Sequence, residues 1–470
     1  MKRFLCLGTV LFLAIICSSC GDVFRPIIIP NPPQFPNPAA SHSVLIVSDN
    51  GIVNTGVETP QLGTAMVIDV SGDTDEGQKT IGLVPIHAVQ QSATQAIVVN
   101  QSAPGADQDS LTKLTFSGTS ISTASAITLP TGSAPNFVAT TEGTQVYVSM
   151  PGYTPPSVAV VNTALGAIKE TIPVGLNPVA IAETPDTKKL YVADYGDSTL
   201  DGFNTQDQSP RTITGSFNSP LWVVARNDSQ RVYVLNGNGV VSTIDTSGPV
   251  SDTVIDASIS VPGAFSMWYD VILNRLYIPA AQQITIVDIS QSIPATLATI
   301  PIATLSPSTS RSSPDPCAGT APGPLKVVAA TSLPDASRAY VGAYYIDSAD
   351  NVCPQVTVIN ATNLTVKTGI AIPGFPDATN PANSTYYVPV CAATRDLVGP
   401  TGGGFRIMMA AGGDSTRAYL SSCDGGNVNI IQTATDTYAL NIPAPFSARP
   451  PIVTGNQNPP QNPVFMIAGP

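Results

Sequence analysis

Four cysteines in the second half of the chain could carry thiol chemistry. Cys317, Cys353, Cys391 and Cys423 are an even number, and no two of them have the C-x2-C spacing that structural zinc sites favour. In an oxidising compartment such a set predicts two disulfides, each contributing about 3 to 4 kcal/mol by the loop-entropy model. Sequence proximity favours Cys317 with Cys353 and Cys391 with Cys423. A zinc site with four thiolate ligands is the alternative.

Residues for acid–base or nucleophilic catalysis are scarce. The only two histidines are His42 and His87, which excludes a His-rich metal centre. His87 lies beside an expected first strand, where a lone histidine is more often structural. The sequence contains no G-x-S-x-G, no P-loop and no glycine-rich dinucleotide turn after a strand. We therefore expect no cofactor and no metal, and we interpret Trp222 and Trp268, on expected inner strands, as core residues.

The N-terminus predicts the compartment. Met-Lys-Arg is followed by an apolar run from Phe4 to Cys17, which is shorter than the roughly 20 residues of a membrane-spanning helix and is typical of a cleaved signal. The ending CSSC resembles a bacterial lipobox, with Cys17 where leucine is usual, and implies cleavage after residue 19 and lipidation of Cys20. An ordinary signal peptide with an incidental cysteine is the alternative. Because residue 21 is glycine and not aspartate, the resemblance favours the outer membrane.

Residues 20–43 are rich in proline and have no helix or strand period. We expect a polyproline-like tether, which at about 3.1 Å per residue could reach roughly 70 Å from the membrane. A strap packed across the domain is the alternative.

The composition predicts an exported all-β protein. Charged residues make up 11% of the chain, the formal net charge is -12, and there are 37 Gly and 44 Pro. Frequent turns and few charges are typical of many short strands, and a negative balance argues against nucleic-acid partners. We expect residues 44–470 to form a single, monomeric domain.

One six-residue strand recurs along the chain. The clear copies are QVYVSM (145–150), KLYVAD (189–194), RVYVLN (231–236), RLYIPA (275–280), RAYVGA (338–343) and RAYLSS (417–422), and two degenerate copies are VLIVSD (44–49) and QAIVVN (95–100). Each full unit has four short β-rich runs separated by turn residues, as in Pro178–Gly215, where RTITG is the expected fourth strand. One such unit cannot bury both of its faces, so the repeat predicts a ring of stacked four-stranded blades.

These units resemble the YVTN family of bacterial β-propeller repeats, in which a strand close to L-Y-V-x-N precedes one ending in V-x-V-I-D. The second motif is present as SVAVVNT (157–163), VVSTIDT (240–246), ITIVDIS (284–290) and VTVINAT (356–362). The resemblance covers roughly residues 44–443 and implies a β-propeller. It implies little about function, because the family includes surface proteins, binding modules and relatives of periplasmic enzymes.

The number of repeats predicts eight blades. Seven units contain all four strands, and the N-terminal unit lacks its inner strand, which the C-terminus can supply from residues 450–455 or 463–469. Pairing the last strand with the first three would close the ring and leave no open sheet edge. Seven blades is the alternative. Insertions are expected near 303–324 and 374–404.

One face should carry the longest loops, because second-to-third-strand loops and inter-blade connections emerge on the same side of an antiparallel blade. All four cysteines should lie on this side. Loops on a rigid scaffold often carry recognition, so this face is the expected binding surface. The candidate contact residues are Tyr153, Tyr195, Tyr344, Tyr345, Asp107, Asp109, Asp197, Asp347 and Asp350. Ordinary solvated turn residues are the alternative.

Two functions remain open on the sequence alone. The favoured one is a non-catalytic, lipid-anchored propeller of the cell envelope that binds a protein or a glycan through its loop-rich face. The other is a hydrolase or lactonase-like enzyme with a polar site at the central channel. Inward carboxylates with perturbed pKa values would favour the enzyme, whereas an apolar or Ser/Thr-lined channel would favour the binding protein.

Overall fold

The computed structural model describes residues 43–54, 57–59, 61–101, 109–118, 120–141, 143–377, 406–447 and 457–468. The predicted signal, tether and lipidation site at Cys20 lie outside these residues, as do Asp107 and Cys391. The described residues form strands, turns and loops without an α-helix. Accordingly, this part of the chain contains no helix long and apolar enough to cross a membrane.

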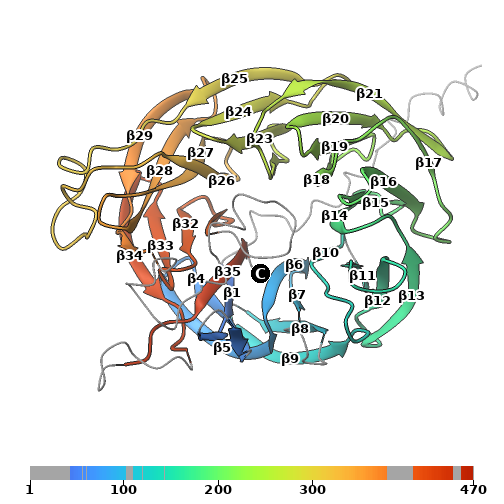
Figure 1. Ribbon diagram of the computed structural model, residues 1–470, viewed down its shortest axis with the longest axis horizontal. Coiled ribbons are helices and arrows are strands. Elements are labelled where there is room, and N and C mark those ends of the chain that lie inside the picture. Colours follow the sequence, from blue (N-terminus) through green and yellow to red (C-terminus); the bar gives the residue numbers. More distant parts are fainter. Residues whose placement is uncertain are drawn as a thin grey trace, which may run out of the picture. The chain divides into compact units, whose positions relative to one another are not determined.

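The described strands form eight blades arranged in a ring (Figure 1). From the inner to the outer strand, the first blade consists of β35 (Asn462–Ala468), β1 (Ser43–Asp49), β4 (Leu62–Asp69) and β5 (Thr74–Leu83). The second blade consists of β6 (Pro85–Ser92), β7 (Gln95–Asn100), β8 (Ser110–Ser117) and β9 (Ser120–Thr128), and the third of β10 (Phe137–Ala139), β11 (Gln145–Met150), β12 (Ser157–Asn162) and β13 (Ala167–Pro173). The fourth blade consists of β14 (Pro178–Glu183), β15 (Lys189–Asp194) and β16 (Thr199–Asn204).

The other four blades follow in chain order. The fifth blade consists of β18 (Pro220–Ala225), β19 (Arg231–Asn236), β20 (Val240–Asp245) and β21 (Ser251–Ser260), with β17 (Thr212–Thr214) at the outer edge, and the sixth of β22 (Trp268–Asp270), β23 (Arg275–Ala280), β24 (Gln283–Asp288) and β25 (Ala295–Pro301). The seventh blade consists of β26 (Lys326–Ser332), β27 (Arg338–Ile346), β28 (Asn351–Asn360) and β29 (Thr365–Ala371), and β30 (Phe375–Pro376) also pairs with β28. The eighth blade consists of β31 (Ile407–Ala411), β32 (Arg417–Ser422), β33 (Asn427–Gln432) and β34 (Thr437–Pro443). The prediction of an all-β, eight-bladed propeller is confirmed.

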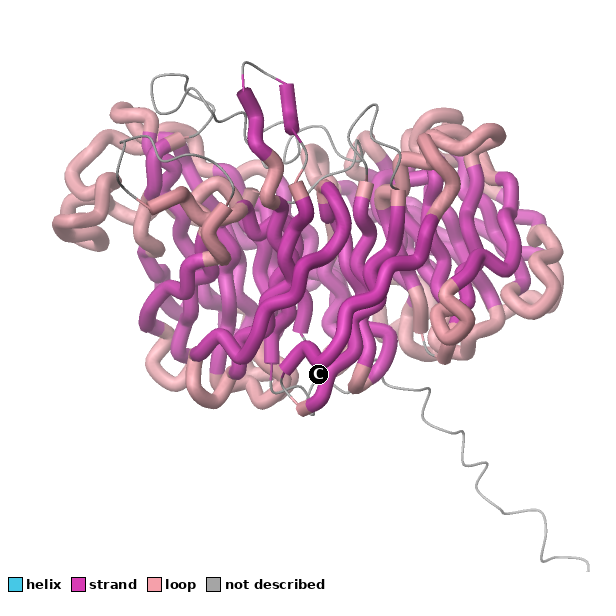
Figure 2. The backbone as a smooth tube through the Cα atoms, turned by 90° about the horizontal axis from the view of Figure 1, so that it is seen from below, coloured by secondary structure: helices cyan, strands magenta, loops and turns pink. Residues whose placement is uncertain are grey.

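The C-terminal strand closes the ring. β35 pairs antiparallel with β1, from Val44 opposite Ala468 to Asp49 opposite Asn462, and so becomes the inner strand of the first blade. Of the two predicted closing segments, the structure therefore uses the one at 463–469. A separate hairpin of β2 (Ile52–Asn54) and β3 (Val57–Thr59) extends beyond the ends of the blades between β1 and β4 (Figure 2).

The repeated tyrosines occupy the interfaces between blades. Tyr147, Tyr191, Tyr233, Tyr277, Tyr340 and Tyr419 are at most 1% exposed. Three of their hydroxyls reach the following blade: Tyr191 donates to Asp252 at 2.9 Å, Tyr340 to Asp436 at 2.6 Å and Tyr233 to the carbonyl of Ile289 at 3.4 Å. The repeat therefore supplies both the apolar surface and the hydrogen bonds that join neighbouring blades.

The prediction for the last strand of the fourth blade was wrong. Residues 209–211 begin to pair with β16, since Arg211 N–H donates to the Gly202 carbonyl at 2.8 Å. The chain then crosses to the next blade, where β17 pairs in parallel with β21. Arg211 holds this crossing through a bidentate ion pair with Asp252, at 2.7 and 2.8 Å, and both side chains are fully buried. The sequence pattern marked a strand but could not identify this partner.

Candidate functional site

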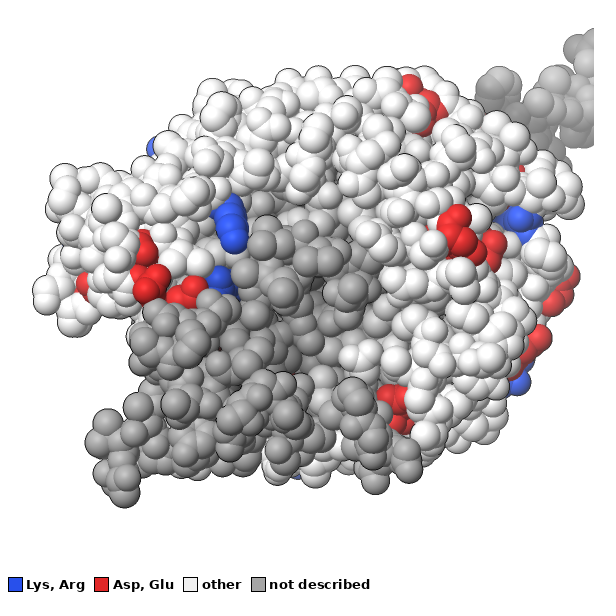
Figure 3. Space-filling model, in the orientation of Figure 1, with Lys and Arg blue, Asp and Glu red and all other residues white. Residues whose placement is uncertain are grey.

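The loop-rich face is built as the sequence predicted. Loops between second and third strands bond to the connections that enter each blade: Gly196 N–H donates to the Leu176 carbonyl at 2.8 Å, and Gly237 N–H donates to the Asn218 carbonyl at 2.8 Å. In the seventh blade, Gly323 N–H donates to the Ile346 carbonyl at 3.0 Å. We call the surface formed by these loops and connections the loop-rich face. Few charged side chains are visible in Figure 3, and they lie in separate groups.

The structure separates the candidate contact residues of this face by exposure. Asp197 and Asp350 are exposed, and Tyr153 and Tyr195 are half-buried. Asp109 is 1% exposed and accepts hydrogen bonds from Ser133 and Ala134, so it supports a loop and is not presented to a partner. Binding by the exposed members remains a proposal.

Tyr344 and Tyr345 were predicted as contact residues, and the structure corrects this prediction because both are fully buried. The β27–β28 hairpin continues past the repeat as far as Ile346, so both tyrosines lie within a strand. Lys326 and Arg406 lie 5.5 and 5.3 Å from the centre of the Tyr344 ring, which makes two cation–π contacts. These tyrosines therefore stabilise the seventh blade and do not present their side chains to a partner.

Cys317 and Cys353 form a disulfide, as predicted, which ties the insertion before β26 to β28. Cys423 is also disulfide-bonded, and its predicted partner Cys391 lies outside the described residues. Asp347 lies against the Cys317–Cys353 bond, but sulfurs shared in a disulfide are not free thiolate ligands.

Asp347, another predicted contact residue, is 5% exposed and holds this loop together. Its carboxylate accepts hydrogen bonds from Thr320 and from the Asn351 backbone, at 2.6 and 2.8 Å. Burial alone would raise the pKa of Asp347, but these hydrogen bonds outweigh burial and hold the pKa below its ordinary value. Asp347 is therefore a structural carboxylate.

Aromatic side chains line part of the central channel. The His87 ring on β6 lies 4.3 Å from the Phe465 ring on β35 and 4.0 Å from the Phe137 ring on β10. Phe137 in turn meets Trp222 of β18 edge to face, at 5.8 Å between ring centres. These rings come from the inner strands of the first, second, third and fifth blades, so aromatic contacts join several blades along this part of the wall.

His87 belongs to this wall. Its Nδ1 accepts a hydrogen bond from the backbone N–H of Val138 at 3.4 Å. Burial lowers the pKa of His87 to about 3, because its aromatic surroundings do not solvate a positive charge. The ring is therefore neutral near pH 7 and is poorly suited to exchange protons there.

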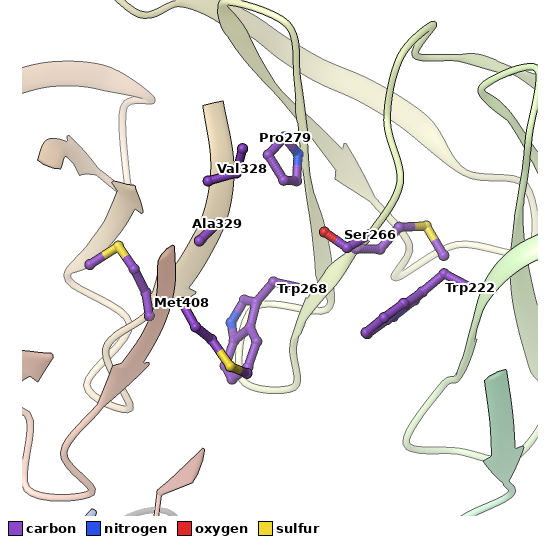
Figure 4. Close-up of a pocket in the computed structure, with 10 residues that line it drawn as sticks. Trp222, Ser266, Trp268, Pro279, Val328, Ala329 and Met408 are labelled. Carbon is purple, nitrogen blue, oxygen red and sulfur yellow. The ribbon is translucent and has the colours of Figure 1, made fainter. Parts of the chain in front are cut away.

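Trp222 and Trp268 lie at a pocket in the channel wall (Figure 4). The pocket has a volume of about 60 Å³, and its other lining residues are Ser266, Met267, Pro279, Val328, Ala329, Ala330, Met408 and Met409. Figure 4 shows both indoles projecting from their strands, with Met408 on the far side of Trp268 from Trp222. Trp268 is 37% exposed, and its Nε1 donates to Ser332 Oγ at 3.2 Å.

The interpretation of Trp268 as a core residue was therefore wrong, whereas Trp222 is half-buried and packs in part against the core between the fifth and sixth blades. A signal for this pocket was present in the sequence, because the only two tryptophans of the chain lie on inner strands of consecutive blades, about one repeat apart. The strand pattern could not separate the edge that faces the channel from the faces that pack against neighbouring blades. Among the described residues that line this pocket there is no Asp, Glu, His, Lys or Arg.

A second, wider cavity of about 550 Å³ lies by the outer strands β5 and β9. Its lining is hydroxyl-rich and includes Thr80, Ser110, Thr112, Ser125 and Thr128. Its lining also includes Asp109, the first described residue after the gap at 102–108. The pocket at the tryptophans is smaller, but it lies at the ring centre and carries both tryptophans of the chain, so we take it as the candidate functional site.

Comparisons with known proteins agree with the class that the architecture defines, an eight-bladed β-propeller. No protein-family model matches the sequence, and no curated protein matches it. Among solved structures, the chain is similar to AztD from Citrobacter koseri, with a TM-score of 0.57 and 10% identity over 91% of this chain and 97% of that one.

The chain is also similar to the dihydro-heme d1 dehydrogenase NirN, with a TM-score of 0.54 and 12% identity over 85% of this chain and 73% of that one. At these identities the similarity supports the fold alone.

Proposed function

We propose that the protein is a non-catalytic binding propeller of the cell envelope, whose ligand enters the central channel and contacts Trp222 and Trp268. The observation that carries this proposal is the pocket where these indoles meet an apolar wall. Large aromatic groups left in contact with solvent are uncommon in a closed core and are enriched at binding surfaces. In this proposal, the exposed loops of the loop-rich face surround the entrance of the channel and contact the ligand there.

The chemistry of the pocket selects a ligand with an apolar ring surface. Indole faces and methionine thioethers offer dispersion and ring-stacking contacts, and Ser266 is the only hydroxyl-bearing residue among the described lining residues. The flat face of a sugar ring and an aromatic side chain of a protein both present such a surface. Both a glycan and a protein segment can therefore present the ring surface that this pocket would bind.

Binding is favoured over the hydrolase or lactonase-like alternative by the chemistry of the channel wall. A hydrolytic site needs an acid, a base or a metal that activates water. The pocket lining has no ionisable residue, and the neighbouring His87 is neutral near pH 7. Among the described residues, the wall therefore has the apolar character expected of a binding site.

The envelope location in this proposal rests on the sequence. The apolar run that ends at Cys20 and the proline-rich stretch after it support export, lipidation and a spacer between membrane and ring. Lipidation of Cys20 would keep the propeller at the membrane, and an outer-membrane position is part of the proposal.

Tryptophan fluorescence gives a direct test. Since the chain has two tryptophans and both line the pocket, their emission reports only on this site. The full-length chain carrying Cys20→Ala, which removes the lipidation site, would be titrated with soluble envelope oligosaccharides and, separately, with short peptides containing phenylalanine or tryptophan analogues that do not fluoresce. We expect one class to shift the emission saturably.

The variants Trp268→Ala and Trp222→Ala should each weaken binding by about 1 to 3 kcal/mol, measured by calorimetry, because an indole in a binding pocket contributes on this order. Phe446→Ala, which removes another exposed aromatic ring (60% exposed) absent from the pocket lining, is the matched control and should bind normally. Saturation by neither ligand class, or equal binding by Trp268→Ala, would contradict the proposal.

A further inference from the structure

Three carboxylates gather at the loop-rich end of the fourth blade, in the stretch DYGDST. Asp194 ends β15, Asp197 lies in the following turn, and Asp201 is on β16. They surround Gly175 of the incoming connection: the Gly175 N–H donates to Asp201 Oδ2 at 3.0 Å. A methyl group added at Gly175 would lie 2.7 Å from Asp197 Oδ1 and 2.8 Å from the Asp194 Cβ. The three acids thus converge on one small region.

Asp194 is the unusual member of this cluster. Its side chain is fully buried, and neither carboxylate oxygen has a hydrogen-bond partner of normal geometry. The backbone N–H groups of Asp201 and Gly175 are near enough to offset part of the cost of a charge there. Even so, burial, followed by the charges of Asp201 and Asp197, raises the pKa of Asp194 to about 9. A buried carboxyl without a donor is costly unless another group compensates it.

Three other blades hold an amide and a hydroxyl at this place. In the fifth blade, Asn236 ends the second strand and its Nδ2 donates to Ser242 Oγ on the third strand at 3.0 Å. In the second blade, Asn100 donates to Thr112 Oγ1 at 3.0 Å, and in the eighth, Asn429 of the third strand donates to Ser422 at 3.1 Å. The fourth blade has two carboxyl groups there, Asp194 and Asp201. The first blade also ends its second strand with an aspartate, Asp49.

We propose that a divalent cation, Ca²⁺ by its preference for carboxylate oxygen, binds between Asp194, Asp197 and Asp201 of the fourth blade. The cation would compensate the buried carboxylates as the amide donor compensates its partner in the second, fifth and eighth blades, and the hydroxyl of Thr199 and water would complete the six to eight oxygen ligands of Ca²⁺. It would enter from the side of Asp197, which is exposed.

Binding requires Asp197 to rotate. The three carboxylates do not each place an oxygen within 4.8 Å of the other two, and Asp197 is held by the Leu176 N–H at 3.0 Å and by the Thr199 hydroxyl at 2.9 Å. These are exposed hydrogen bonds, which exchange with water at small cost. Bringing Asp197 onto the cation would tie the turn after β15 to the strand ends beside it.

The test uses the full-length chain with Cys20→Ala, first treated with a chelator. Tb³⁺ replaces Ca²⁺ in oxygen sites, and its luminescence would be excited through Tyr195, the neighbour of Asp194 in the chain. We expect saturable luminescence that Ca²⁺ displaces, and a Ca²⁺ dissociation constant of about 10⁻⁴ to 10⁻³ M by calorimetry, as in extracellular modules. The melting temperature should rise with Ca²⁺ concentration.

The sequences of the other blades supply the variants. Asp194→Asn and Asp201→Ser copy the residues of the fifth blade, so they should fold well, and each should weaken Ca²⁺ binding at least about tenfold. Asp207→Asn makes the same charge change at an exposed turn of the same blade and should bind Ca²⁺ like the parent chain.

Three results would overturn the proposal. The first is that Ca²⁺ fails to bind the parent chain. The second is that Asp194→Asn binds Ca²⁺ as tightly as the parent, which would place the cation elsewhere. The third is that Asp194→Asn raises the melting temperature while Ca²⁺ has no effect on the parent, which would mean that Asp194 simply holds a proton.

Discussion

At the scale of single residues, Glu183 shows how one buried carboxylate links stability to pH. It ends β14, is 8% exposed, and its Oε2 accepts the backbone N–H and the hydroxyl of Thr141 at 2.7 and 2.6 Å. Burial raises the pKa of Glu183 to about 7, although these hydrogen bonds act in the opposite direction. The Glu183 side chain therefore joins the third and fourth blades, and its carboxyl group ionises at a higher pH than an exposed carboxyl group does.

The first prediction follows from this raised pKa. Because the folded protein holds the Glu183 proton more tightly than the unfolded chain does, the stability contributed by that proton is complete below the unfolded pKa and is lost as pH rises through about 7. Between pH 5 and pH 8, the free energy of unfolding of the parent protein should fall by up to roughly 2 to 3 kcal/mol because of Glu183. In Glu183→Gln this part of the fall should be absent, as measured by denaturant unfolding.

The matched control for this prediction is Glu170→Gln, on an exposed position of β13. It should keep the pH profile of the parent protein. The same slope in Glu183→Gln and the parent would show that Glu183 does not titrate in this range.

At the scale of elements, β17 follows the fourth blade in the chain but pairs with the fifth, and the ion pair of Arg211 with Asp252 holds this crossing. We predict a large effect of removing that ion pair. Removing one member of a buried ion pair leaves the other charge unpaired at a cost of about 3 to 5 kcal/mol. We expect Arg211→Ala to lower the free energy of unfolding by this amount, because the buried carboxylate of Asp252 would lose its ion-pair partner and keep only the hydrogen bond from the Tyr191 hydroxyl.

Arg231→Ala supplies the comparison for Arg211. Arg231 pairs with Asp245 at 2.9 Å in the same blade, but this pair is partly open to solvent, so its loss should cost less than about 1 kcal/mol. Equal effects of the two substitutions in chemical unfolding would show that the Arg211 pair does not hold the crossing.

The elements also show where the sequence was informative. The recurrence of apolar strands predicted blades that stack on one another, and the tyrosines of the six clear copies are indeed buried between blades. The crossing of β17 was not predictable, because the choice between two neighbouring edges depends on Arg211 and Asp252, which are 41 residues apart and meet only in the folded chain. Tyr344 was misplaced for a related reason: its hairpin continues beyond the repeat, and no turn residue marks the extension.

At the scale of the whole molecule, closure by β35 is the contact on which the ring depends. Val464, Phe465 and Met466 are at most 5% exposed and pack against strands of the first blade and its neighbours. Burying three such side chains contributes on the order of 5 kcal/mol. We predict that a chain ending at Ser447 loses cooperative thermal unfolding, followed by circular dichroism.

A synthetic peptide of residues 457–468 should restore the transition in the truncated chain, whereas a scrambled peptide should not, because the register with β1 fixes which side chains face the core. A truncated chain that unfolds as cooperatively as the complete one would show that seven blades and an open first blade suffice.

The candidate site shows the limit of sequence reasoning at this largest scale. Repeat counting predicted the ring, its eight blades and the strand type that closes it, since each is a property of local pattern and chain order. Which residues face the channel depends on how the inner strands tilt once the ring has closed. Trp222 and Trp268 therefore stood out only in the structure.

The position of β35 also sets an order of events in time. The inner strand of the first blade, β35, is the last described strand to leave the ribosome, so the ring cannot close before β35 has been made. Joining ends separated by most of the chain costs about 5 kcal/mol in loop entropy, and contacts this distant in sequence form slowly. Seven blades can thus assemble first while the eighth position remains unfinished. Because the ring cannot close before β35 is present, the strands that precede it stay free to thread through a narrow passage until then.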